Sequence, residues 1–317
     1  MEKTMAFLLR ALLLLQSVDF LIAMILSKSQ PVDFLTGAFE TSEGYIAHEW
    51  NYKKTKGPDT WPALYPECAG ANQSPVAIVT SQAVTSPDLG PVELLGYRNK
   101  RLTMQAFNNG HTVKFKFTAD TPTKRPVRFR SYRQKQPVDA YELAEIHLHW
   151  GQTEFEGSEH SLDGQYYPAE IHFVHKLTRL TLDEALKTPK GLAVLGAFFI
   201  IGQGDNPAYE PIISSLGNIQ YKNETTTMKF TKTLRSLLPH DVTQFFRYDG
   251  SLTTPTCNEV VVWTVFRNPI WISARQMDAF RGVMKSYRGE PPSPIQTNYR
   301  PVQLINTRQI LKYGIYH

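Results

Sequence analysis

The sequence predicts a mainly β protein of one domain, with a minor α+β character from a few peripheral helices. Most apolar residues occur in short segments where they alternate with polar residues, as in half-buried strands. Gly, Pro, Asn and Asp separate these segments, and no repeat or low-complexity linker divides residues 45–317. A chain of 317 residues with 42% hydrophobic composition is long and apolar enough for one large core.

Only a few segments carry a clear period. The clearest strand candidates are Thr112–Phe117, Glu145–Trp150, Glu170–His175 and Glu259–Phe266. Helices are expected over Leu182–Lys187 and Ser273–Tyr287, since Met277, Phe280 and Met284 recur in the second stretch at spacings of three and four.

The first 29 residues are expected to be a secretory signal peptide, because Lys3 precedes apolar runs that end near residue 26. Arg10 and Asp19 interrupt these runs, and Ser27 and Ser29 are the candidate cleavage positions. A membrane anchor is the alternative, but Asp19 would then lie inside the span. Residues 30–44 are assigned to an N-terminal approach segment and residues 45–317 to the domain.

The chain has two cysteines, Cys68 and Cys257. In an exported chain such a pair favours one disulfide, whereas in a cytosolic chain two buried thiols are the better interpretation. Asn223, in Asn-Glu-Thr, is a predicted glycan acceptor. Asn72 fits the same pattern but is discounted, because Pro75 follows its Ser74 and Cys68 lies near.

The charge pattern argues against nucleic-acid binding. The 34 basic residues exceed the 29 acidic ones by only 5, and they are spread along the chain. The densest basic stretch, from Lys124 to Lys135, is interpreted as a solvated loop or edge strand, with an anion-attracting surface as the alternative.

The histidines give the main functional signal. Because side chains alternate along a strand, Glu145, His147 and His149 should share one face. The same rule puts Glu170, His172 and Val174 on one face of the second strand. If the two strands are neighbours, three imidazoles converge with two carboxylates behind them.

Three histidines and one open position are typical of a catalytic zinc site. A single strand histidine more often satisfies a hydrogen bond, and His147-x-His149 alone would leave the question even. The third histidine, with Glu170 two residues before it to accept a ring N–H, favours a zinc cofactor.

At this point the sequence resembles the α-class carbonic anhydrases, in particular exported animal-type members, from about residue 50 to residue 311. The matching segments are His147-Leu148-His149-Trp150-Gly151, Gly157–Asp163, Ala169–His175, Gly250–Pro255, Gln73-Ser74-Pro75 and Asn298-Tyr299-Arg300-Pro301. The resemblance implies a twisted, mostly antiparallel sheet of ten strands with zinc at the base of a cleft. It also implies reversible hydration of carbon dioxide to bicarbonate and a proton by a zinc-held hydroxide.

The resemblance assigns further roles by position. Thr253 would orient the hydroxide and donate its own proton to Glu159, and His111 would carry protons to buffer. Glu145 and Glu170 would support the zinc ligands, and Cys68 and Cys257 match the single disulfide of exported members. The remaining positions are the proton path, Tyr52 and Asn109, and the substrate pocket, Thr254, Val174, Val194, Leu252, Val261 and Trp263.

Two positions depart from the family pattern. Glu145 replaces a common glutamine, which leads us to expect a more basic zinc-bound water. Lys114 replaces a polar residue of the cleft wall, where it would either repel protonated His111 or attract bicarbonate.

The alternative function is a catalytically weak member that acts as a secreted matrix or interaction protein. We expect instead an active enzyme, because all three histidines, Thr253 and Glu159 are present. We also expect the protein to be a secreted monomer without a stable membrane span.

Overall fold

The computed structural model describes residues 49–100, 102–117, 127–131 and 140–315. The predicted signal peptide and approach segment lie outside these residues. So do Lys124, Arg125, Arg133 and Lys135 of the basic stretch. No helix in the described part of the chain is both long and apolar enough to cross a membrane.

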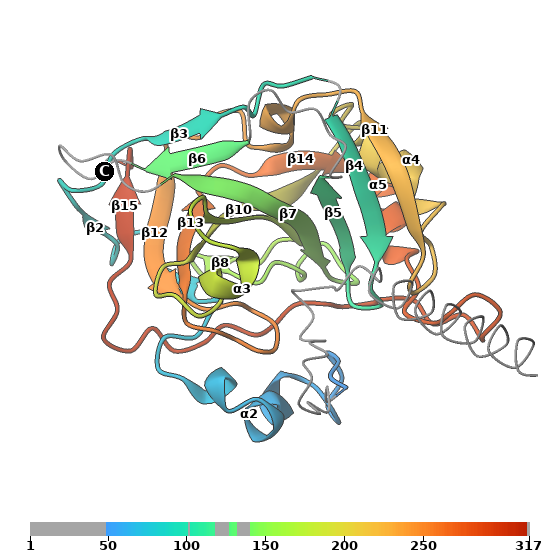
Figure 1. The fold of residues 1–317 in the computed structure, drawn as a ribbon, viewed down its shortest axis with the longest axis horizontal. Helices are drawn as coiled ribbons and strands as arrows, with labels where there is room; N and C mark the ends of the chain where they lie inside the picture. Colours follow the sequence, from blue (N-terminus) through green and yellow to red (C-terminus); the bar gives the residue numbers. More distant parts are fainter. Residues whose placement is uncertain (1–48, 101, 118–126, 132–139, 316–317) are drawn as a thin grey trace, which may run out of the picture. The chain divides into compact units, whose positions relative to one another are not determined.

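One large sheet of 13 strands dominates the described residues (Figure 1). Ten strands form its main path, in the order β11-β4-β5-β7-β9-β10-β13-β12-β15-β2. The bounds along this path are Thr225–Phe230, Leu102–Asn108, Val113–Phe117, Tyr141–Trp150, Ala169–Leu177, Leu192–Gly202, Val261–Phe266, Phe245–Gly250, Leu311–Tyr313 and Val84–Thr85. The mainly β, single-domain prediction is therefore confirmed.

Three strands lie off this path, namely β3 (Val92–Leu95), β6 (Arg128–Ser131) and β14 (Ile270–Ser273). Most neighbours in the sheet pair antiparallel, and the parallel pairs are β10 with β13, β10 with β14, and β15 with β2. The short strands β1 (Ala77–Ile78) and β8 (Ser161–Leu162) pair separately.

The helices are few and short. The α-helices are α2 (Trp61–Leu64), α3 (Leu182–Ala185), α4 (Glu210–Leu216) and α5 (Ala274–Arg281), and the 3-10 segments are η2 (Pro58–Thr60), η3 (Pro66–Ala69) and η4 (Leu234–Leu237). Helices α4 and α5 contact each other and lie beside the β11 edge (Figure 1).

Helix α5 is shorter than its periodicity predicts. Ser273 and Gln276 form a capping box at its start, and Met277 and Phe280 are buried in the core. The helix ends at Arg281, because Gly282 follows and the backbone of Met284 pairs with Gln220 and Pro294 instead. The extension to Tyr287 is therefore wrong.

Helix α3 also ends earlier than predicted, at Ala185, after a capping box between Thr181 and Glu184. The four predicted strands all exist, with ends that differ by a few residues from the predicted ones.

A β-bulge in β7 determines which face carries the histidines. Tyr141 and Leu143 belong to the hydrophobic core, and so do Ile146, Leu148 and Trp150. In a regular strand the odd-numbered and even-numbered residues would face opposite sides of the sheet. The register against β9 shifts between Leu143 and Glu145, which inserts one unpaired residue. Since one residue reverses every later side chain, the bulge turns Glu145, His147 and His149 to the face opposite the core.

A disulfide joins Cys68 to Cys257, 189 residues apart, which confirms the predicted pairing. Both cysteines are buried with Trp50 and Trp61 in a small apolar cluster that Tyr52 and Tyr65 flank. The bridge therefore ties the segment before β1 to the loop that follows β12, where Thr253 lies.

Candidate metal centre

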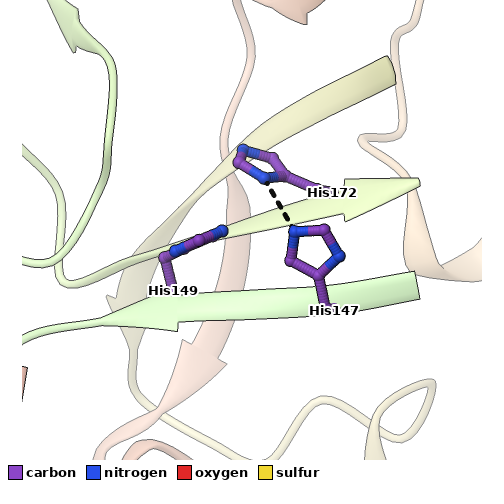
Figure 2. A group of neighbouring side chains, drawn as sticks. All are labelled: His147, His149 and His172. Atoms are coloured by element: carbon purple, nitrogen blue, oxygen red, sulfur yellow. Dashed lines mark hydrogen bonds between the residues drawn. The ribbon is translucent and has the colours of Figure 1, made fainter. Parts of the chain in front are cut away.

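Three imidazoles from two neighbouring strands converge on one point (Figure 2). His147 on β7 pairs directly with His172 on β9, and His149 lies two residues further along β7. Each offers one ring nitrogen within a group whose members all lie within 4.8 Å of one another. The prediction that the faces of the two strands coincide is thus correct.

The second ring nitrogen of each histidine, which faces away from this point, has a hydrogen-bond partner. His147 Nδ1 is 3.0 Å from Glu145 Oε1, His149 Nδ1 is 2.7 Å from the carbonyl oxygen of Asn298, and His172 Nε2 is 2.8 Å from Glu170 Oε1. These contacts leave His147 Nε2, His149 Nε2 and His172 Nδ1 to face one another. A hydrogen-bonded second nitrogen is what fixes the tautomer and orientation of a histidine ligand.

The geometry fits a tetrahedral metal ion. His149 Nε2 is buried and has no hydrogen-bond partner among the described residues. His147 Nε2 and His172 Nδ1 are 3.3 Å apart. Two nitrogens bound to zinc at 2.0–2.1 Å in a tetrahedron lie about 3.3–3.4 Å apart, so the pair already has the spacing of two zinc ligands.

Burial keeps the His149 and His172 imidazoles in the neutral form that can bind a metal. It lowers the pKa of His172 to about 4. Burial and then the neighbouring His172 and His147 hold the pKa of His149 well below its usual range.

Glu170 is buried beneath His172 and belongs to a hydrogen-bond network. Its Oε2 accepts from the backbone N–H groups of Glu159 and His160, each at 2.9 Å, and its Oε1 contacts His160 Nδ1 at 2.7 Å. Burial alone would raise the pKa of Glu170, but His160 and the hydrogen bonds from His160 and His172 hold it well below the usual range. Glu170 therefore supports its ligand as a carboxylate.

This network continues from His160 toward the Thr253 loop. His160 Nε2 contacts the Tyr248 hydroxyl at 2.7 Å, which in turn donates to Ser74 Oγ at 2.9 Å. Ser74 Oγ also accepts from the N–H of Ser251, two residues before Thr253. No role was predicted for His160, although the segment Gly157–Asp163 that contains it matches the family pattern.

Glu145 supports His147 in a different setting. Lys114 Nζ lies 3.5 Å from its Oε1, and Lys116 Nζ lies 3.5 Å from its Oε2. Burial opposes ionisation, but Lys114, the hydrogen bond with His147 and then Lys116 lower the pKa of Glu145 to about 2. The prediction that Glu145 makes a zinc-bound water more basic did not take these two lysines into account.

The role of Lys116 was not predicted, although alternation along the strand puts it on the same face as Lys114 and could have indicated it. Asn298 was missed as a partner of His149 because a main-chain carbonyl leaves no trace in the sequence.

Thr253 and Glu159 lie together at the site. Burial raises the pKa of Glu159 well above its usual range, although the Thr253 hydroxyl and the N–H of Arg300, which donates to Oε1 at 2.9 Å, act in the opposite direction. Glu159 Oε2 has no close hydrogen-bond partner among the described residues. Thr254, the next residue, is half-buried.

An apolar wall adjoins the histidines. Val194 on β10 pairs with Val174 on one side and with Trp263 on the other. The Trp263 ring packs edge-on against His172, with centroids 4.8 Å apart. Val261 is buried and Leu252 half-buried in the same part of the chain. The predicted pocket positions thus come from three adjacent strands and one loop.

Gly196 leaves room for this packing. It pairs with His172, and a Cβ there would meet Glu170 Oε1 at 3.1 Å and the Trp263 ring at 3.6 Å. No sequence signal pointed to this glycine.

The predicted proton carrier His111 lies in the turn before β5, and its ring stacks on Trp50 with centroids 3.9 Å apart. Asn109 Oδ1 accepts from the N–H groups of His111 and Thr112, so this side chain shapes the turn. Burial raises the pKa of Tyr52 well above its usual range, and the charge of Glu159 adds to this effect. The proton-path role of these residues stays a prediction.

Both glycosylation sequons carry an exposed asparagine. Asn223 has a positive φ of 67°, and the Asn72 amide donates to Glu259. The choice of Asn223 over Asn72 stays a prediction.

The sheet and the three-histidine centre together define a mononuclear metalloenzyme class. The family model for eukaryotic-type carbonic anhydrases matches residues 56–314. Human (Homo sapiens) carbonic anhydrase 3 is 37% identical over 84% of this chain and 98% of its own length. Mouse (Mus musculus) carbonic anhydrase 7 is 35% identical over 83% of this chain and 96% of its own length.

The chain therefore belongs to the eukaryotic-type carbonic anhydrase family. Members are lyases that hydrate carbon dioxide, and the α-class enzymes use zinc. The ligand positions that this chemistry requires are all present among the described residues.

Proposed function

We propose that this chain is an active zinc enzyme that hydrates carbon dioxide with His111 as proton carrier, and that it is exported as a monomer. The observation that carries the proposal is the set of three inward ring nitrogens, each oriented by a hydrogen bond on its far side. The alternative of a catalytically weak matrix protein gains no support, since every zinc ligand is retained.

Zinc, when bound, supplies a hydroxide near neutral pH by lowering the pKa of water to about 7, a value established for carbonic anhydrase itself. Thr253 would accept a hydrogen bond from that nucleophile and pass its own proton toward Glu159, which directs a lone pair at the substrate. The wall formed by Val174, Val194 and Trp263 is apolar, since the indole N–H of Trp263 is taken up by the Ser251 carbonyl oxygen, and this suits a neutral carbon dioxide molecule.

Each turnover releases a proton that must reach solvent. Histidine titrates near neutral pH, and His111 is half-buried on a turn whose next residues enter β5 beside the site. Stacking on Trp50 restricts the position of the His111 ring. Tyr52 and Asn109 would organise water between His111 and the centre.

Export is supported by the disulfide between Cys68 and Cys257, because such bonds persist in oxidising compartments. Expression in secretory cells should give a protein with a new N-terminus near residue 29 and a glycan on Asn223. Size-exclusion chromatography checks the monomer.

The decisive experiment measures zinc stoichiometry and carbon dioxide hydration on the same purified sample. We expect one zinc per chain and hydration that a zinc chelator removes in parallel with the metal. A folded, metal-free chain that neither rebinds zinc nor regains carbon dioxide hydration would contradict the proposal.

The proton carrier has its own test. We expect His111→Ala to lower kcat by roughly 100-fold in dilute buffer and leave kcat/KM unchanged, because proton export follows the carbon dioxide step. Imidazole in solution should restore much of the loss. Equal losses in kcat and kcat/KM would instead show that His111 acts in the hydration step.

A further inference from the structure

Strand β5 places two lysines against the carboxylate that supports His147. Lys114 pairs with His147 across the β5–β7 ladder, and its ammonium group is 3.5 Å from Glu145 Oε1. Lys116 Nζ is 3.5 Å from Glu145 Oε2. One carboxylate thus lies between two ammonium groups and also accepts a hydrogen bond from a ligand imidazole.

The burial of these groups strengthens the interactions between their charges. The side chains of Lys114 and Glu145 are 5% and 1% exposed, whereas that of Lys116 is 32% exposed. Charges that are shielded from water interact strongly, and a buried cation that loses its anion carries a large penalty. A lysine beside a zinc ligand would also repel the metal unless a carboxylate offsets its charge.

The contacts also restrict how the carboxylate can turn. Oε1 accepts from His147 Nδ1 at 3.0 Å, on the same side as Lys114, while Oε2 faces Lys116. Rotation of the carboxylate would break both ion pairs at once. Fixing Glu145 in this way fixes the tautomer that leaves His147 Nε2 for the metal.

We propose that Lys114, Lys116 and Glu145 act as one unit beside His147, in which the carboxylate both orients the imidazole and offsets the lysine charges, so that zinc retention requires the Glu145 carboxylate while Lys114 is present. The inference rests on the proposed zinc function. It implies that glutamine at position 145, which suits other members of the family, does not suit this chain while Lys114 remains.

The test is a double-mutant cycle on zinc release. Zinc-loaded wild type, Glu145→Gln, Lys114→Met and the double variant are mixed with excess chelator, and the rate of zinc transfer is followed. Glu145→Gln should release zinc about 10–100-fold faster, because His147 loses its carboxylate partner and Lys114 loses its ion pair with that carboxylate. Lys114→Met should release zinc no faster than wild type.

The double variant separates the proposal from a simple loss of one hydrogen bond. It should release zinc at least about fivefold more slowly than Glu145→Gln alone, since Lys114→Met takes away the positive charge that position 145 no longer offsets. Release rates that merely combine as independent effects would overturn the proposal.

Two controls keep the outcome clear. Lys229→Met removes an exposed strand lysine on β11 and should leave zinc release unchanged. Thermal unfolding of each metal-free variant shows whether it folds, and Lys116→Met replaces Lys114→Met in the cycle if the latter does not. A unit that only stabilises the fold would shift unfolding without coupling in zinc release.

Failure of this inference differs from failure of the proposed function. A wild-type chain that binds no zinc would remove the proposed function and this inference with it. A chain that binds zinc and hydrates carbon dioxide, but shows no coupling in the cycle, would remove only the inference.

Discussion

Strands β7 and β9 share one local pattern, a glutamate two residues before a histidine ligand, but they surround that glutamate differently. On β9, Glu170 is satisfied by two backbone N–H groups and by His160. On β7, Glu145 is balanced by two lysine side chains from β5. The two carboxylates also bind opposite ring nitrogens, Nε2 of His172 and Nδ1 of His147.

This difference shows that the pattern supplies an acceptor but does not say how its charge is balanced. Backbone donors are fixed by the fold and cannot be removed by substitution. Lysines are side chains, so the β7 side can be altered residue by residue. We therefore expect substitutions around Glu170 on β9 to change mainly the free energy of unfolding, and substitutions around Glu145 on β7 to change mainly zinc binding.

The largest effect should come from the ligands themselves. His147→Ala and His172→Ala should each lower zinc affinity by more than about 100-fold, because even loss of an outer partner costs about 10–100-fold. Hydration should be lost in both. Zinc titration monitored with a chromophoric chelator measures the affinities, and full zinc binding by either variant would show that its strand is dispensable.

The next largest effect should distinguish the two glutamates. Glu170→Gln places an amide NH₂ among donors and should destabilise the metal-free protein by about 3–5 kcal/mol, as loss of one partner in a buried ionic network does. Glu145→Gln should cost less. Urea unfolding of the two metal-free variants gives the comparison, and equal losses would contradict the division between the strands.

The pH dependence of the unfolding free energy should arise in part from a histidine on β9. His175 lies on the core face of β9, where burial lowers its pKa to about 3. The unfolded state therefore binds more protons between about pH 6.5 and pH 3, and stability falls as the pH is lowered through this range.

One such group contributes a slope of up to about 1.4 kcal/mol per pH unit. His175→Gln should flatten the curve of unfolding free energy against pH for the metal-free protein, although His172 will still titrate. An unchanged slope would show that His175 is not a source of acid sensitivity.

The smallest effect concerns the outer lysine. The Lys116 side chain is 32% exposed. Its ion pair should therefore contribute less than about 1 kcal/mol to stability. Chemical unfolding of Lys116→Met measures this, with Lys114→Met as the buried counterpart. A loss for Lys116→Met as large as that for Lys114→Met would mean that exposure does not weaken the outer pair.

The sequence by itself determined the ligands and the class of fold. Alternation along a strand is a local property, so His147 and His149 could be assigned to one face, and Glu170 to the face of His172, without knowledge of the neighbours. The family pattern added Thr253, Glu159 and the cysteine pair, which lie far apart in the chain.

Tertiary structure decided what these residues touch. Only strand order could bring β5 beside β7 and set Lys114 and Lys116 against Glu145. Only the fold could place the Asn298 carbonyl on His149, since a main-chain acceptor has no sequence signature. Alternation fixes the direction of a side chain, whereas pairing register and bulges fix its partners, and in this protein those partners set the charge around the metal centre.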